Sequence, residues 1–206
     1  MIDWSIHEEW LENQVKHLPE WHRVIYATLC GERVLPAYEA YATNARDRNQ
    51  AFSELASLQS ALEFVWANIG MTTFDQMEAE GHLRTLEIFV EQKEEEPGSW
   101  SLWQTHAIDA TYIVMNAVST LLHGNAEEVI AAATHLHDTV SYFAQGKYEV
   151  PSQVPSERIE SDPVVQDELE RQQRDMLVLS SHKDADPRIL FRDLRIRAKN
   201  EKALPI

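Results

Sequence analysis

Apolar residues recur at helical spacing along almost the whole chain, and this periodicity is the feature that most constrains the fold. In the segment 50–69, for example, Leu55, Leu58 and Leu62 are three or four residues apart, which places them on one side of an α-helix. No run of useful length shows the period of two that a half-buried strand requires. The pattern predicts an all-α protein.

Start and stop signals divide the chain into about seven to nine predicted helices. Asp162 and Pro163 form a helix cap and first-turn pair, and Asp186 and Pro187 repeat it. Gly124 is a typical helix terminator. The predicted helical segments cover approximately residues 5–18, 19–36, 50–69, 74–96, 108–122, 128–143, 162–179 and 186 onward.

Four local features refine this prediction. Ser5 has the spacing of a capping box for the first helix, Pro36 is expected to end or kink the second, and Gly81 is expected to split the fourth. Residues 146–161 contain two prolines and no sustained periodicity, so they predict an extended connection across the surface. We interpret residues 1–206 as a single-domain helical bundle, long enough to bury a substantial core.

The chain is strongly acidic, with 34 acidic and 18 basic residues and a formal net charge of −16. This charge disfavours binding to the phosphate backbone of a nucleic acid. Residues 183–202 are the exception, with seven basic and four acidic groups. Two interpretations stay open: the charge keeps the protein soluble, or it steers a cationic partner to the surface.

The single cysteine and the absence of a signal-peptide pattern predict a cytoplasmic protein without an internal disulfide. The longest apolar stretches contain a charge and fall short of the roughly 18–20 residues that span a bilayer. We therefore expect no membrane anchor.

Cys30 invites interpretation as a nucleophile, because an acid and a base, Glu32 and Arg33, follow it closely. It lies, however, toward the end of an apolar helical stripe, where a free cysteine usually acts as a small buried hydrophobe and where the helix C-terminus disfavours an anion. We predict that Cys30 is a packing residue. Glu32 and Arg33 are expected to form an ion pair, or to stabilise the end of the helix before Pro36.

The sequence "THLHD" suggests a metal site, since His135 and Asp138 are three residues apart and share a helix face. His137 points elsewhere, and no HExxH or ExxH motif is present. A phosphohydrolase would need further ligands, for which the preceding helix offers His106, Asp109 and His123. We predict no metal, cofactor or catalytic residue, and expect a stabilising contact between His135 and Asp138.

An acidic run with nearby tryptophans is the best candidate for a protein-binding surface. Carboxylates gather at a helix end and the following loop, and tryptophan is enriched in interface hot spots. The predicted partner-binding residues are Glu91, Glu94, Glu95, Glu96, Trp100 and Trp103.

Four segments also carry a family resemblance: "WHRVIYATLCGERVLPAYEAY", "LQSALEFVWANI", "AIDATYIVMNAVSTLLHG" and "SDPVVQDELERQQRDMLVL". In order and approximate spacing they resemble the YjaG-like bacterial proteins, domain of unknown function 416. The resemblance implies an all-helical cytoplasmic domain without established activity, and it supplies no catalytic residues. In that family the cysteine, acid and base are contiguous, so Gly31 looks like an insertion that bends the turn. The corresponding family helix lacks "HLHD", and residues 1–18 and 146–161 match least well.

Two classes of function remain, with a purely structural oligomer as a third in reserve. The first is a non-catalytic acidic protein-binding module, most concretely an immunity protein that neutralises a cationic bacterial toxin. The alternative is an uncharacterised enzyme, such as a metal-dependent hydrolase that uses His135 and Asp138. The partner of the first class is a basic protein, and the oligomeric state is left open.

Overall fold

The computed structural model describes residues 1–95, 102–148 and 151–205, and in these ranges it contains α-helices and no strands. This confirms the all-α prediction. The helices are α1 (Trp4–Lys16), α2 (Glu20–Asn44), α3 (Arg48–Asn68), α4 (Gln76–Glu95), α5 (Leu102–His123), α6 (Ala126–Gln145), α7 (Ser156–Glu160), α8 (Pro163–Ser181) and α9 (Pro187–Asn200). A single turn of 3₁₀-helix, η1, covers Pro151–Gln153. None of the described helices has the length and apolar character that crossing a membrane would require.

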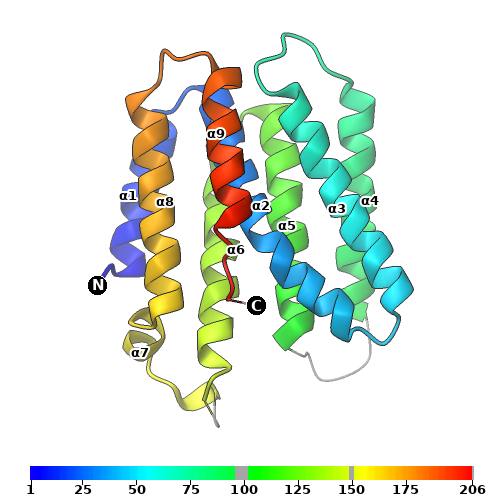
Figure 1. Ribbon diagram of the computed structural model, residues 1–206, viewed down its shortest axis with the longest axis vertical. Coiled ribbons are helices and arrows are strands. Elements are labelled where there is room, and N and C mark those ends of the chain that lie inside the picture. The colour runs from blue at the N-terminus through cyan, green and yellow to red at the C-terminus, as the bar shows by residue number, and fades with distance from the viewer. Residues whose placement is uncertain (96–101, 149–150, 206) are drawn as a thin grey trace.

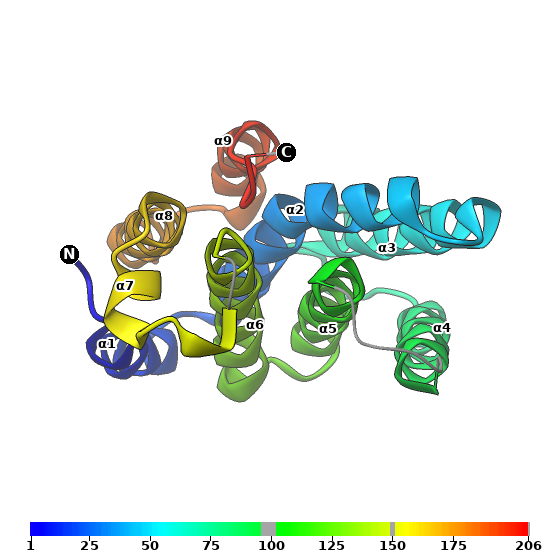
Figure 2. The ribbon, with the colours of Figure 1, turned by 90° about the horizontal axis from the view of Figure 1, so that it is seen from below.

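The helices form two layers (Figures 1 and 2). One layer contains α1, α6, α5 and α4, and the other contains α8, α9 and α3. The long helix α2 runs obliquely and packs against α3, α5, α6, α8 and α9. The core therefore centres on α2 and α5, whose inward faces are mostly apolar but also bury Arg33 and His106.

Most of the predicted helix ends are confirmed. The Asp162 carboxylate accepts a hydrogen bond from the Val164 amide (3.0 Å), and the Asp186 carboxylate accepts one from the Arg188 amide (2.9 Å). Gly124 follows α5 with φ +66°, a conformation that favours glycine.

The structure corrects the four local expectations. Asp3, not Ser5, caps α1, since its carboxylate accepts hydrogen bonds from the amides of residues 5 and 6. α2 does not end at Pro36 but continues to Asn44, because packing on both sides of the helix outweighs one lost backbone hydrogen bond; the expected kink stays a prediction. α4 runs through Gly81 without a break. The connection 146–161 is not simply extended, because it contains η1 and α7.

Gly31 is an interior residue of the continuous helix α2 and does not lie in a turn, contrary to the expectation drawn from the family pattern. A Cβ atom at this position would lie 2.7 Å from Cδ2 of Leu62 in α3. The missing side chain lets α2 and α3 approach closely.

Candidate functional site

The outer side of α4 carries a row of exposed carboxylates. Glu80, Glu87, Glu91 and Glu94 recur at spacings of seven, four and three residues, so they share one side of the helix. We call this set the acidic α4 face. Arg84 lies in the same row and pairs with Glu80 (3.0 Å).

The acidic α4 face contains two of the predicted partner-binding residues, Glu91 and Glu94. Glu95 is the last residue of α4. Glu96 and Trp100, and the side chain of Glu95, lie outside the described part of the chain.

The acidic α4 face continues across α5 onto α6 through aromatic residues. Glu94 accepts a hydrogen bond from the Tyr112 hydroxyl (3.4 Å), and the Tyr112 ring stacks on His135 with centroids 5.0 Å apart. Burial raises the pKa of Tyr112, and the nearby Glu94 raises it further. Asp138 and Tyr142 add an exposed carboxylate and an exposed aromatic ring on α6.

Trp103 belongs to a different surface. Nine residues separate it from Tyr112, which places the two on opposite sides of α5. Trp103 lines a recess of about 280 Å³ at the junction of α2, α3 and α5, together with Tyr41, Gln50 and Glu54. The structure therefore does not join Trp103 and the acidic α4 face into one patch.

A buried charged group lies at this recess. The Glu54 carboxylate is 4% exposed and accepts hydrogen bonds from the Tyr38 hydroxyl (2.5 Å), from Gln50 (3.0 Å) and from Lys93. The Lys93 ammonium also lies 5.4 Å from the centroid of the Tyr41 ring. The hydrogen bonds satisfy the Glu54 oxygens and the Lys93 ammonium neutralises their charge. The contacts hold α2, α3 and α4 together, so we assign them a structural role.

The contacts of the histidines in α6 differ from the one that the sequence predicted. His135 Nδ1 lies 3.2 Å from an Asp109 carboxylate oxygen on α5, and Asp138 lies instead 3.6 Å from His137. His137 stacks on Trp4 of α1, with ring centroids 3.9 Å apart. The expected His135–Asp138 contact is thus wrong, because the closest carboxylate comes from the neighbouring helix.

No metal centre forms among the described residues, where no group of three His, Cys, Asp or Glu side chains could hold an ion. His106 is completely buried, and neither ring nitrogen has a hydrogen-bond partner in the described chain. His123 lies exposed at the end of α5. Among the described residues, His135 and Asp109 thus form a pair without a third ligating side chain.

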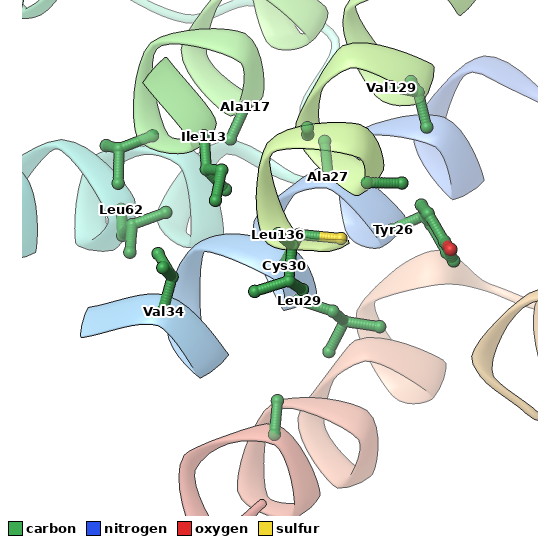
Figure 3. Packing of buried hydrophobic residues seen from close by; sticks show 14 of the residues in the cluster. Tyr26, Ala27, Leu29, Cys30, Val34, Leu62, Ile113, Ala117, Val129 and Leu136 are labelled. Atoms are coloured by element: carbon green, nitrogen blue, oxygen red, sulfur yellow. The ribbon is translucent and has the colours of Figure 1, made fainter. Parts of the chain in front are cut away.

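Cys30 lies in the centre of the core, among residues of α2, α3, α5 and α6 (Figure 3). Its side chain is inaccessible to solvent, and burial raises the pKa of the thiol to about 12. The packing role predicted for it is confirmed, because a thiolate is the reactive species and this site disfavours one.

We expect the Cys30→Ala variant to lose about 1–2 kcal/mol of unfolding free energy through the lost packing. Native protein should resist iodoacetamide, whereas protein unfolded in urea should be alkylated readily, which mass spectrometry can measure. Rapid alkylation of the native protein would contradict the buried position of the thiol.

Glu32 and Arg33 do not pair with each other as expected, because they contact different helices. Glu32 accepts hydrogen bonds from the Trp66 indole in α3 (2.7 Å) and from Arg195 in α9 (3.0 Å). Arg33 contacts Glu168 (3.0 Å) and Asp175 (2.5 Å), both in α8.

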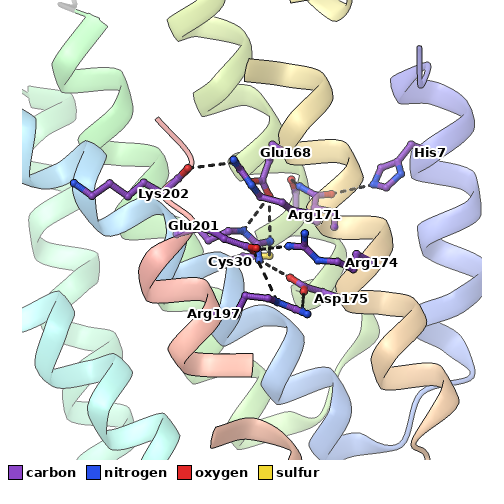
Figure 4. Close-up of polar contacts among 12 residues, drawn as sticks. His7, Cys30, Glu168, Arg171, Arg174, Asp175, Arg197, Glu201 and Lys202 are labelled. Carbon is purple, nitrogen blue, oxygen red and sulfur yellow. Dashed lines mark hydrogen bonds and ion pairs between the residues drawn. The ribbon is translucent and has the colours of Figure 1, made fainter. Parts of the chain in front are cut away.

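A buried ion network extends from Arg33 toward α9. Figure 4 shows its members on α8 and α9. Glu168 is fully buried and Asp175 is 1% exposed. Asp175 also pairs with Arg197 of α9, and Arg171 approaches Glu168 from the surface at 3.6 Å. The network joins α2, α8 and α9. Because its carboxylates are already paired, we assign it a structural role.

A solved structure of another protein has the same fold as this chain. A crystal structure of a DUF416 family protein from Shewanella baltica OS155 has the same fold, with a TM-score of 0.70 and 19% sequence identity. The match covers 92% of this chain and 93% of that one. A search of the curated proteins finds no match. The family model described as "Protein of unknown function (DUF416)" matches residues 11–203, which include α2 to α9, so the chain belongs to the DUF416 family.

Proposed function

We propose that this chain is an acidic, non-catalytic binding module for a basic protein, and specifically an immunity protein that neutralises a cationic bacterial toxin. The observation that carries the proposal is the acidic α4 face, in which four exposed carboxylates share one side of a peripheral helix. The one base in this row, Arg84, is already paired with Glu80. The remaining carboxylates present a negative surface to a partner.

The residues around the acidic α4 face favour a protein as the partner. Tyr112 lies on the neighbouring helix α5 and Tyr142 on α6 beyond it, and tyrosine is enriched among interface residues that contribute most to affinity. Met77 and Ile88 are exposed on the flank of α4. A negative field around such a surface speeds the approach of a cationic protein and aligns it before contact.

The test reverses the charge of three residues in the acidic α4 face, Glu87→Lys, Glu91→Lys and Glu94→Lys. A basic protein captured by crosslinking to wild type is purified, and its association rate is measured over a range of salt concentrations. We expect the triple variant to bind at least about tenfold more slowly and with a flatter salt dependence. Inhibition of the captured protein's toxicity by wild type would support the immunity role.

A matched control makes the same charge change far from α4. The variant Glu9→Lys, Asp167→Lys and Glu170→Lys alters exposed carboxylates of α1 and α8, at the opposite edge of the molecule (Figure 1). It should retain most of the wild-type association rate. Equal effects of the two triple variants would show that only net charge matters and would overturn the assignment of this surface.

A further inference from the structure

The outermost side of α4 carries an apolar row beside the acidic α4 face. Met77 and Ile88 are 82% and 49% exposed, although folding usually buries residues of these types. About three helical turns separate them, so they project from the same side of the helix. Leu86 and Val90, which are buried, lie on the opposite side of α4. Figure 2 shows α4 at the edge of the molecule, so the row is open to a partner.

Gly81 lies in the same row, one turn after Met77 and two turns before Ile88. Glycine destabilises a helix interior relative to alanine, so a glycine there usually has a packing reason. Gly31 has one, since its missing side chain makes room for Leu62. A Cβ atom at Gly81 would meet no neighbouring part of the described chain within 4 Å. Packing within the chain therefore does not account for Gly81, whereas close approach of another backbone would.

The acidic α4 face runs alongside Met77, Gly81 and Ile88, which we call the α4 apolar row. Glu87 and Glu91, in the middle of the face, take part in no ion pair within the described ranges of the chain. These carboxylates are thus available to the cations of a partner.

The pattern of the two rows indicates what kind of segment fits them. Both rows follow the helical repeat of α4, so a matching segment needs an apolar row and a basic row side by side with the same repeat. A basic amphipathic helix has this pattern, and such helices commonly bind through apolar anchors spaced at one and two turns. A bare acidic surface without the α4 apolar row would not favour a helix over any other cationic segment.

We propose that the α4 apolar row and the acidic α4 face together bind a basic amphipathic α-helix of the partner protein. Apolar side chains of that helix contact Met77 and Ile88, and its backbone passes closest to α4 at Gly81. Its lysine and arginine side chains lie over Glu87 and Glu91. This inference rests on the proposed function and adds the kind of segment that the acidic α4 face recognises.

Two synthetic peptides of about 18 residues test this recognition. Both contain the same leucines, lysines and alanines. In the first peptide the leucines and the lysines form adjacent rows at the helical repeat, and in the second the order is shuffled so that no row forms. Fluorescence anisotropy in about 150 mM salt should show that the amphipathic peptide binds at least about tenfold more tightly, because only this peptide matches both rows.

A substitution at Gly81 tests the place of closest approach. Gly81→Leu should weaken binding of the amphipathic peptide at least about tenfold and leave binding of the shuffled peptide unchanged, because the new side chain occupies the space that the peptide backbone needs. The matched control Asn13→Leu adds a leucine at an exposed position of α1, at the opposite edge of the molecule, and should leave both affinities unchanged. Circular dichroism checks that both variants are folded.

Charge reversal separates this inference from the proposed function. The variant Glu87→Lys, Glu91→Lys and Glu94→Lys should weaken binding of both peptides. If the two peptides bind wild type equally, or if Gly81→Leu binds the amphipathic peptide as wild type does, the helix inference is overturned, while an effect of charge reversal still supports the proposed function. Charge reversal without effect on either peptide would contradict both. Absence of amphipathic-peptide binding at about 500 µM would also overturn the helix inference.

Discussion

Replacement of Arg33 by methionine is expected to lower the unfolding free energy by about 3–5 kcal/mol. Arg33 is 1% exposed and is paired with Glu168 and Asp175, which are also buried. Removal of the guanidinium leaves Glu168 inside the protein without its main cation, and an uncompensated buried charge is strongly destabilising. Urea denaturation followed by circular dichroism measures the loss.

Two further variants separate the charge effect from lost packing. Arg192→Met removes an exposed arginine and should change stability by less than about 0.5 kcal/mol. The double variant Arg33→Met, Glu168→Leu should be more stable than Arg33→Met alone, because Asp175 keeps Arg197 as its partner. A loss below about 1 kcal/mol for Arg33→Met would show that the network tolerates an unpaired carboxylate.

Acid is expected to destabilise the protein through His106, by about 2 kcal/mol at pH 5 relative to pH 7. Burial lowers the pKa of His106 from 6.5 to about 4. Because the folded pKa lies below the unfolded one, the unfolded chain binds the proton more readily. The stability from neutral His106 is complete above pH 6.5 and is lost as the pH falls toward 4. Burial also lowers the pKa of His7 and His22, which adds to the trend.

Urea denaturation at several pH values tests this expectation. His106→Leu should flatten the fall in stability between pH 6.5 and 4, whereas replacement of the exposed His17 by glutamine should leave that slope unchanged. If His106→Leu has the same slope as wild type, protonation of other groups controls the acid response.

The parts of the fold that the sequence predicts well depend on neighbouring residues. Helical periodicity and the caps at Asp162 and Asp186 act within one or two turns. The packing role of Cys30 could likewise be predicted from the apolar residues of its own helix. The continuation of α2 through Pro36 could not be predicted in this way, because packing against several other helices decides it.

The polar contacts were less predictable because their partners are distant in sequence. Asp109 contacts His135 across 26 positions, which a search within one helix misses. The acids Glu91 and Glu94 were identified from local composition. Tyr112 joins that surface only because α5 packs beside α4.

The arrangement around Arg33 also has a consequence during synthesis of the chain. Its carboxylate partners follow it by 135 and 142 residues. At about 5–20 residues per second, a ribosome adds the second partner roughly 7–28 s after Arg33. Until both are made, Arg33 lacks at least one of its buried carboxylate partners, and the emerging chain holds a guanidinium that belongs in the core. α2 leaves the ribosome before α8 and therefore reaches its final environment only after α8 has been made, so a segment that is synthesised later completes the centre of the protein.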